Sequence, residues 1–92
     1  MSTLFHMTIS LNESSTEGDL VKTMNLAADW FRINDSSWLV WSTSDRAKWK
    51  ERLYPIVRPG GSLIILQVDR VRWGGYANSE IWDWLKKHRP ST

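Results

Sequence analysis

The first residues of the chain alternate between apolar and polar side chains. From Phe5 to Leu11 every second residue is apolar, and the residues between them are His6, Thr8 and Ser10. This period of two is typical of a β-strand with one apolar face. The pattern therefore predicts an opening strand that contacts a hydrophobic core on one side.

A helix is predicted after the polar loop that follows this strand. Thr16 and Asp19 have the spacing of a capping box, and Glu17 and Asp19 suit the positive end of a helix dipole. Apolar residues then follow at helical spacing: Leu20, Met24, Ala27 and Ala28. One face of this helix is expected to be buried.

The next segment predicts a β-hairpin. Two runs rich in β-forming residues, WFRI at 30–33 and WLVW at 38–41, flank a short polar stretch. That stretch contains Asn34, Asp35 and Ser36, residue types that tolerate tight turns.

A second helix and a final strand complete the pattern. Ser44 or Asp45 is predicted to cap the helix, and apolar residues recur along it at intervals of four and three, namely Trp49, Leu53 and Ile56. Pro55 is expected to loosen the last turn because it has no N–H, and Pro-Gly-Gly at 59–61 ends the helix. The run SLIILQV at 62–68 is strongly β-forming.

The predicted order is strand, helix, strand, strand, helix, strand. This is the ferredoxin-like βαββαβ order, in which two helices cover one face of a four-stranded antiparallel sheet. We therefore predict a single α+β domain over residues 1–92, with a ferredoxin-like core at about 3–69 and an aromatic C-terminal extension at about 70–90.

The C-terminal extension is predicted to cover the sheet face that lacks helices. The third and fourth strands are apolar on both faces, so an uncovered face would be a site of association. After the turn at Gly74-Gly75, Asn78 or Ser79 is predicted to cap a helix through about Lys87. The residues expected to cover the sheet, or to form an interface, are Trp73, Trp82, Trp84 and Leu85.

The strand at 62–68 is expected to lie at an edge of the sheet. An apolar edge strand without a neighbour is prone to pair with another chain, so a homodimer is predicted. The sequence leaves open whether the C-terminal extension covers its own sheet or that of the second copy.

Charge is unevenly distributed along the chain. Residues 1–45 carry two basic against six acidic side chains, net −4, and residues 46–92 carry ten against four, net +6. A basic half attracts phosphate backbones, but it can also pair with the acidic half of the same or a second chain. The candidate nucleic-acid-binding residues are Arg46, Lys50, Arg70 and Arg72. The four basic residues Arg46, Lys48, Lys50 and Arg52 alternate along the second helix, so they do not all share one face.

Composition predicts a soluble, cytoplasmic protein. The chain has no cysteine, its N-terminal residues lack the features of a secretory signal, and no apolar run approaches the roughly 20 residues that span a bilayer. No membrane partner is therefore expected.

No constellation of residues in the sequence predicts catalysis, a metal site or a cofactor. His6 and His88 have no neighbour at metal-ligand spacing, and Ser10 lies about 13 Å along the strand from His6, too far for a proton relay. Asp69, beside Arg70 and Arg72, is interpreted as an ion-paired end of a strand. The stacking signature of RNA-recognition domains is missing, because Trp38 and Trp41 point to opposite faces.

Three segments resemble a group of small bacterial proteins of undefined role that are often labelled SinR-like: TISLN at 8–12, DSSWLVWST at 35–43 and WGGYANSEIWDWLKKH at 73–88. That group is in turn similar in fold and length to the CRISPR-adaptation small nucleases and related toxin-like proteins. The resemblance implies a ferredoxin-like homodimer, and some of those relatives are metal-dependent nucleases with an aspartate at the end of the first strand. That position is Ser10 here, and a serine brings no negative charge to a divalent cation.

Two functions are consistent with the sequence. The first is a non-catalytic, homodimeric interaction module. The alternative is a nucleic-acid-binding protein or a metal-dependent nuclease, which the basic second half and the resemblance favour.

Overall fold

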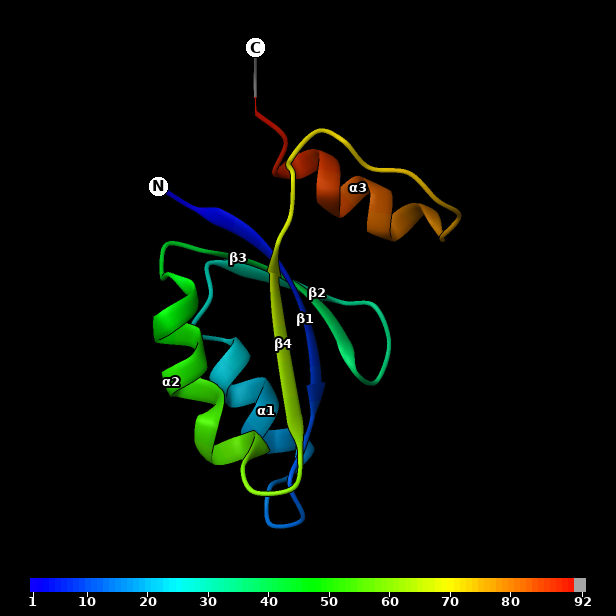
Figure 1. The fold of residues 1–92 in the computed structure, drawn as a ribbon. Helices are drawn as coiled ribbons and strands as arrows, with labels where there is room; N and C mark the ends of the chain where they lie inside the picture. The colour runs from blue at the N-terminus through cyan, green and yellow to red at the C-terminus, as the bar shows by residue number, and fades with distance from the viewer. Residues whose placement is uncertain (91–92) are drawn as a thin grey trace.

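A computed structural model describes residues 1–90 as a four-stranded antiparallel sheet with three helices (Figure 1). The strands follow the order β2-β3-β1-β4 across the sheet, which is the ferredoxin-like arrangement. The elements are β1 (Thr3–Ser10), α1 (Glu17–Met24), β2 (Asp29–Arg32), β3 (Ser37–Ser42), α2 (Arg46–Val57), β4 (Ser62–Gln67) and α3 (Ser79–Lys87). The predicted α+β fold with an extra C-terminal helix is confirmed.

The central strand β1 bonds alternately to its two neighbours. The N–H of Ile9 donates to the carbonyl of Ser36 on the β3 side, and the N–H of Val68 donates to the carbonyl of Leu4 on the β4 side. In the antiparallel register Phe5 faces Gln67 and Thr8 faces Ile64. Odd-numbered residues of β1 therefore bond toward β3, and even-numbered residues bond toward β4.

The main core lies between the sheet and the helices α1 and α2. Figure 1 shows both helices on the same side of the sheet. Trp38 and Trp49 are fully buried there, and Trp49 Nε1 donates to Ser42 Oγ at 3.1 Å. The other buried members of this core are Phe5, Met7, Ile9, Leu20, Met24, Val40, Leu53, Ile56 and Val57.

A second core lies on the opposite face of the sheet, under α3. Trp84 and Leu85 of α3 pack against Leu4 of β1 and Leu39 of β3. Partly buried side chains surround these four residues: Phe31, Trp41, Val68, Trp73, Ile81 and Trp82. The extension thus covers the sheet of its own chain, a point that the sequence left open.

Each helix begins at a capping residue. Thr16 and Asp19 form the predicted capping box of α1, Asp45 caps α2 and Asn78 caps α3. In each case a side-chain oxygen accepts a backbone N–H that has no partner within the helix. The sequence offered two candidate caps for each of the last two helices. The residue that caps α2 is Asp45 and not Ser44, and the residue that caps α3 is Asn78 and not Ser79.

The helix α2 runs through Pro55 and ends two residues later. The buried Asn12, in the loop after β1, donates from Nδ2 to the carbonyls of Pro55 at 2.9 Å and Arg58 at 2.8 Å. Its backbone N–H donates to the carbonyl of Ile56. A side chain from another element therefore satisfies carbonyls that the helix end leaves free.

Polar contacts attach the end of α3 to β2. His88 Nε2 lies 2.8 Å from Asp29 Oδ2, and Lys87 Nζ lies 3.0 Å from the same oxygen. The His88 ring stacks on Trp41 with a centroid separation of 4.6 Å. Partial burial alone would raise the pKa of Asp29, but the hydrogen bond from His88 and the interaction with Lys87 outweigh it, so this pKa lies below its usual value.

We expect Asp29→Asn to loosen the docking of α3 at neutral pH by about 1 kcal/mol, because the amide carries no charge to attract Lys87. The folded-state pKa of Asp29 is depressed, so its contribution is present above the unfolded-state pKa and is lost as the pH falls through the folded-state pKa. Hydrogen exchange of the α3 amides measures the effect. Asp83→Asn, on an exposed residue of α3, is the control; equal exchange in the two variants would contradict the prediction.

Within residues 1–90, no helix is long and apolar enough to cross a membrane.

Candidate functional site

The outer edge of β4 presents backbone groups with no partner strand. β4 has β1 as its one neighbour in the sheet of residues 1–90. Even-numbered residues of β4 bond toward β1, as the hydrogen bond from Val68 to Leu4 shows. The N–H and C=O groups of Leu63, Ile65 and Gln67 therefore point outward, away from the sheet.

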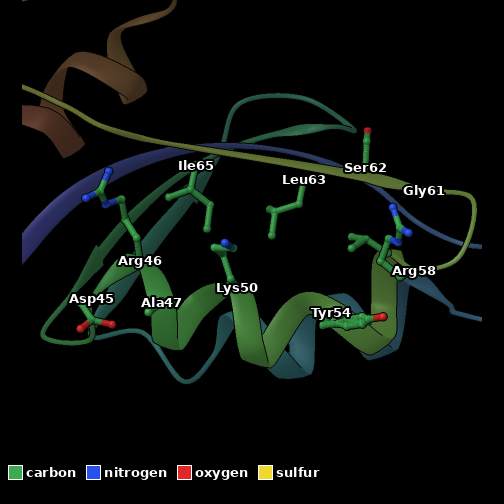
Figure 2. A pocket seen from close by; sticks show the side chains of 11 residues that line it. Asp45, Arg46, Ala47, Lys50, Tyr54, Arg58, Gly61, Ser62, Leu63 and Ile65 are labelled. Atoms are coloured by element: carbon green, nitrogen blue, oxygen red, sulfur yellow. The ribbon is translucent and has the colours of Figure 1, made fainter.

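A groove lies between this edge and α2. It is open to solvent and has a volume of about 830 Å³, and Leu63 and Ile65 form its apolar side. Figure 2 shows both side chains pointing from β4 toward α2, with Lys50 rising toward them from the helix. The other residues that line the groove are Asp45, Arg46, Ala47, Tyr54, Val57, Arg58, Gly61 and Ser62.

Four of the lining residues form a single stripe along α2 and its end. Arg46, Lys50 and Tyr54 recur at intervals of four residues, so they lie on one side of α2. Arg58, the residue at the C-terminal cap of α2, lines the same groove. We refer to these four residues as the α2 stripe. Sequence reasoning identified Arg46 and Lys50 but missed Tyr54 and Arg58, because it compared alternate basic residues. The four-residue interval was the signal that would have shown them.

The groove carries a net positive charge. Arg46, Lys50 and Arg58 contribute three cations, and Asp45 contributes one carboxylate, which already accepts the N–H of Lys48 as the helix cap. Within residues 1–90, none of the three cations takes part in an ion pair. These cations are therefore available to an acidic ligand.

The other face of β4 is apolar and exposed. Ile64 and Leu66 each expose 55% of their surface on the side of the sheet that α3 covers only in part. They pair across the sheet with Thr8 and His6 of β1. The edge of β4 is thus flanked by apolar side chains on both faces.

Arg70 and Arg72 lie away from the α2 stripe. Arg70 stacks on Trp41 at 4.6 Å and donates from Nε to the carbonyl of His88, so it helps to hold the C-terminal extension. Arg72 is exposed and lies 3.8 Å from Asp69. The four predicted nucleic-acid-binding residues therefore divide between two regions, on opposite faces of the sheet.

The predicted aromatic cover occupies the second core. Trp84 and Leu85 are buried, whereas Trp73 and Trp82 lie partly exposed at its margin. Trp73 Nε1 donates to the carbonyl of Asp69, and Arg89 stacks on the Trp73 ring at 5.1 Å. Backbone hydrogen bonds from Val71 and Arg72 lower the pKa of Asp69, which closes the turn after β4.

Ser10 and His6 stand apart from the groove lining. Ser10 is exposed at the end of β1 and pairs with Ser62, and His6 is partly buried on the face of the sheet opposite the main core. Among residues 1–90, no three acidic, histidine or cysteine side chains are grouped closely enough to hold a metal ion.

The fold and the groove define a small α+β protein of ferredoxin-like type with an open, basic edge. Comparison of the chain with protein-family models, curated proteins and solved structures found no match.

Proposed function

We propose that this protein is a non-catalytic interaction module that binds a partner polypeptide as an additional strand along β4. The observation that carries the proposal is the outer edge of β4. It offers the N–H and C=O groups of Leu63, Ile65 and Gln67 between two apolar surfaces. Such an edge is a template for another strand, because main-chain hydrogen bonds supply affinity and flanking side chains supply selectivity.

The sequence of β4 supports a binding role. Proteins protect edge strands from association with charged residues, proline or bulges. The strand SLIILQ contains neither a charged residue nor a proline. Within residues 1–90 no second strand pairs with its outer edge, and the backbone groups of Leu63, Ile65 and Gln67 make no hydrogen bond to the backbone of a loop or helix, so an added strand has access to them.

Ile65→Pro tests strand addition. The N–H of Ile65 points outward, so proline removes an edge donor while keeping the bonds between β4 and β1. We expect peptides selected from a random display library to bind the original protein and to lose binding in this variant. Ile65→Val keeps the N–H and is the matched control. On binding, hydrogen exchange of the Leu63, Ile65 and Gln67 amides must slow.

Thermal unfolding of both variants establishes that they are folded. Selected peptides that bind Ile65→Pro as well as the original protein would contradict strand addition at this edge.

A second copy of the chain is the second candidate partner. A two-fold axis would pair β4 with itself and cover Ile64 and Leu66 of both copies. The resemblance to small ferredoxin-like homodimers favours the same assembly. Light scattering on the same samples distinguishes the two partners. A dimer that forms with increasing concentration and is lost in Ile65→Pro would show that the partner of β4 is a second copy of the chain and not another polypeptide.

A further inference from the structure

We infer that the strand that binds β4 is acidic, with carboxylates and apolar side chains at alternate positions. This inference rests on the proposed function. In this arrangement the carboxylates of the bound strand contact the α2 stripe, and its apolar side chains contact Ile64 and Leu66.

The α2 stripe and a bound strand have similar repeat distances. Residues four apart in a helix are separated by about 6 Å along its axis. Alternate residues of a strand are separated by about 6.7 Å. The groove is lined by Arg46, Lys50, Tyr54 and Arg58 on one side and by β4 on the other, and α2 runs alongside β4 (Figure 2). Every second side chain of an added strand therefore lies opposite one of the three helical members of the stripe, Arg46, Lys50 and Tyr54, and Arg58 follows at the end of the helix.

Carboxylates are the side chains that these positions favour. Three of the four stripe residues are cations, and an arginine binds a carboxylate through two parallel hydrogen bonds. Tyr54 exposes 54% of its surface, and its hydroxyl donates to the same kind of acceptor. An acidic strand thus neutralises the groove, whereas a basic strand is repelled.

The remaining side chains of the bound strand face the other side of the sheet. There they lie beside Ile64 and Leu66, whose exposed apolar surface is removed from water when apolar residues cover it. The strand therefore alternates between the two kinds of side chain, with a period of two.

A second copy fits this groove less well. β4 carries no carboxylate, and pairing two copies through β4 places two α2 stripes on the same face of the joined sheet. Each groove brings three cations against one carboxylate, so the copies repel each other electrostatically. Salt would relieve this repulsion, whereas it weakens the binding of an acidic strand.

A nucleic acid would match the positive charge of the α2 stripe, but it would not match the hydrogen-bonding groups at the outer edge of β4. Phosphates would neutralise the α2 stripe, as they do other basic surfaces. The outer edge of β4 offers backbone C=O acceptors as well as N–H donors, and a phosphate group accepts hydrogen bonds but donates none. These features favour a polypeptide.

The test uses a fluorescent peptide of about eight residues that alternates glutamate and valine, and the same peptide with glutamine in place of glutamate. Binding of each to the full chain is measured by fluorescence anisotropy. A labelled single-stranded oligonucleotide is the third probe. Lys50→Gln removes a charge from the stripe, and Lys48→Gln removes one from an exposed lysine of α2 outside the groove lining.

We expect the glutamate peptide to bind at least about tenfold more tightly than the glutamine peptide, a difference of about 1.4 kcal/mol. Its affinity falls between about 50 mM and about 300 mM salt, because the charges at the groove are open to solvent. Lys50→Gln weakens it about fivefold, while Lys48→Gln leaves it nearly unchanged. Ile65→Pro removes the binding of both peptides.

Equal affinity of the two peptides, with both lost in Ile65→Pro, would overturn the acidic partner and leave strand addition standing. Peptide binding that is absent, or that Ile65→Pro does not change, would overturn both proposals. Tight binding of the oligonucleotide that is lost in Lys50→Gln but kept in Ile65→Pro would assign the groove to nucleic acid and also overturn both.

Discussion

Replacing Trp49 with alanine is expected to lower the free energy of unfolding by about 3–5 kcal/mol. Trp49 is fully buried between α2 and the sheet, and its Nε1 donates to Ser42 Oγ at 3.1 Å. Alanine leaves a cavity in the main core and removes one of the two hydrogen bonds that Ser42 Oγ accepts, the other coming from the N–H of Ser44. Arg52, which stacks on the Trp49 ring at 4.8 Å, also loses its partner.

The total free energy of unfolding of a small domain is about 5–15 kcal/mol, so the loss expected for Trp49→Ala is a large part of it. Urea unfolding followed by circular dichroism measures it. Trp49→Phe is the matched control, because it keeps an aromatic ring in the core but loses the N–H. A loss below about 1 kcal/mol in the alanine variant would show that the core is not packed as described.

Gly61→Ala is expected to produce the second-largest effect, about 1–3 kcal/mol or more, because it inserts a methyl group between backbone segments. A Cβ at Gly61 would lie 2.6 Å from the carbonyl oxygen of Val57 and closer still to that of Ser10. Both neighbours are main-chain atoms at the ends of α2 and β1, so they move only if the elements themselves shift. The variant also moves the start of β4, and we expect it to weaken peptide binding at the groove.

Gly74→Ala is the control for this substitution. A Cβ at Gly74 meets no atom within 4 Å, so the same chemical change is expected to leave the stability nearly unchanged. Thermal unfolding of the two variants provides the comparison. Similar unfolding temperatures for both would contradict the close approach of Ser10, Val57 and Gly61.

The fold was predictable because each element carries its own local signal. The capping box at Thr16 and Asp19, the turn residues between β2 and β3, and the alternation in β1 all act over a few neighbouring residues. Their order then determined the ferredoxin-like arrangement, since few topologies accommodate it.

The groove was only partly predictable. Arg46 and Lys50 were identified by their charge, but Arg58 lies beyond the end of α2 and Tyr54 carries no charge. Arg70 and Arg72 were grouped with them on charge alone, yet the chain reaches the other face of the sheet before Arg70 stacks on Trp41. A count of charges along the sequence does not show that the chain passes from one face of the sheet to the other between α2 and Arg70.

The sequence by itself determined the order of the helices and strands, the capping box of α1 and the need to cover a sheet that is apolar on both faces. The predicted apolar face of α1 was too long, because the helix ends at Met24 and Ala27 and Ala28 lie beyond it. The tertiary structure alone decided that α3 covers its own sheet, that Asn12 binds the end of α2, and that the α2 stripe lies beside the free edge of β4. The physical reason is the range of the interactions. Periodicity and capping depend on residues within one or two turns, whereas these contacts join segments that are brought together only when the whole chain is folded.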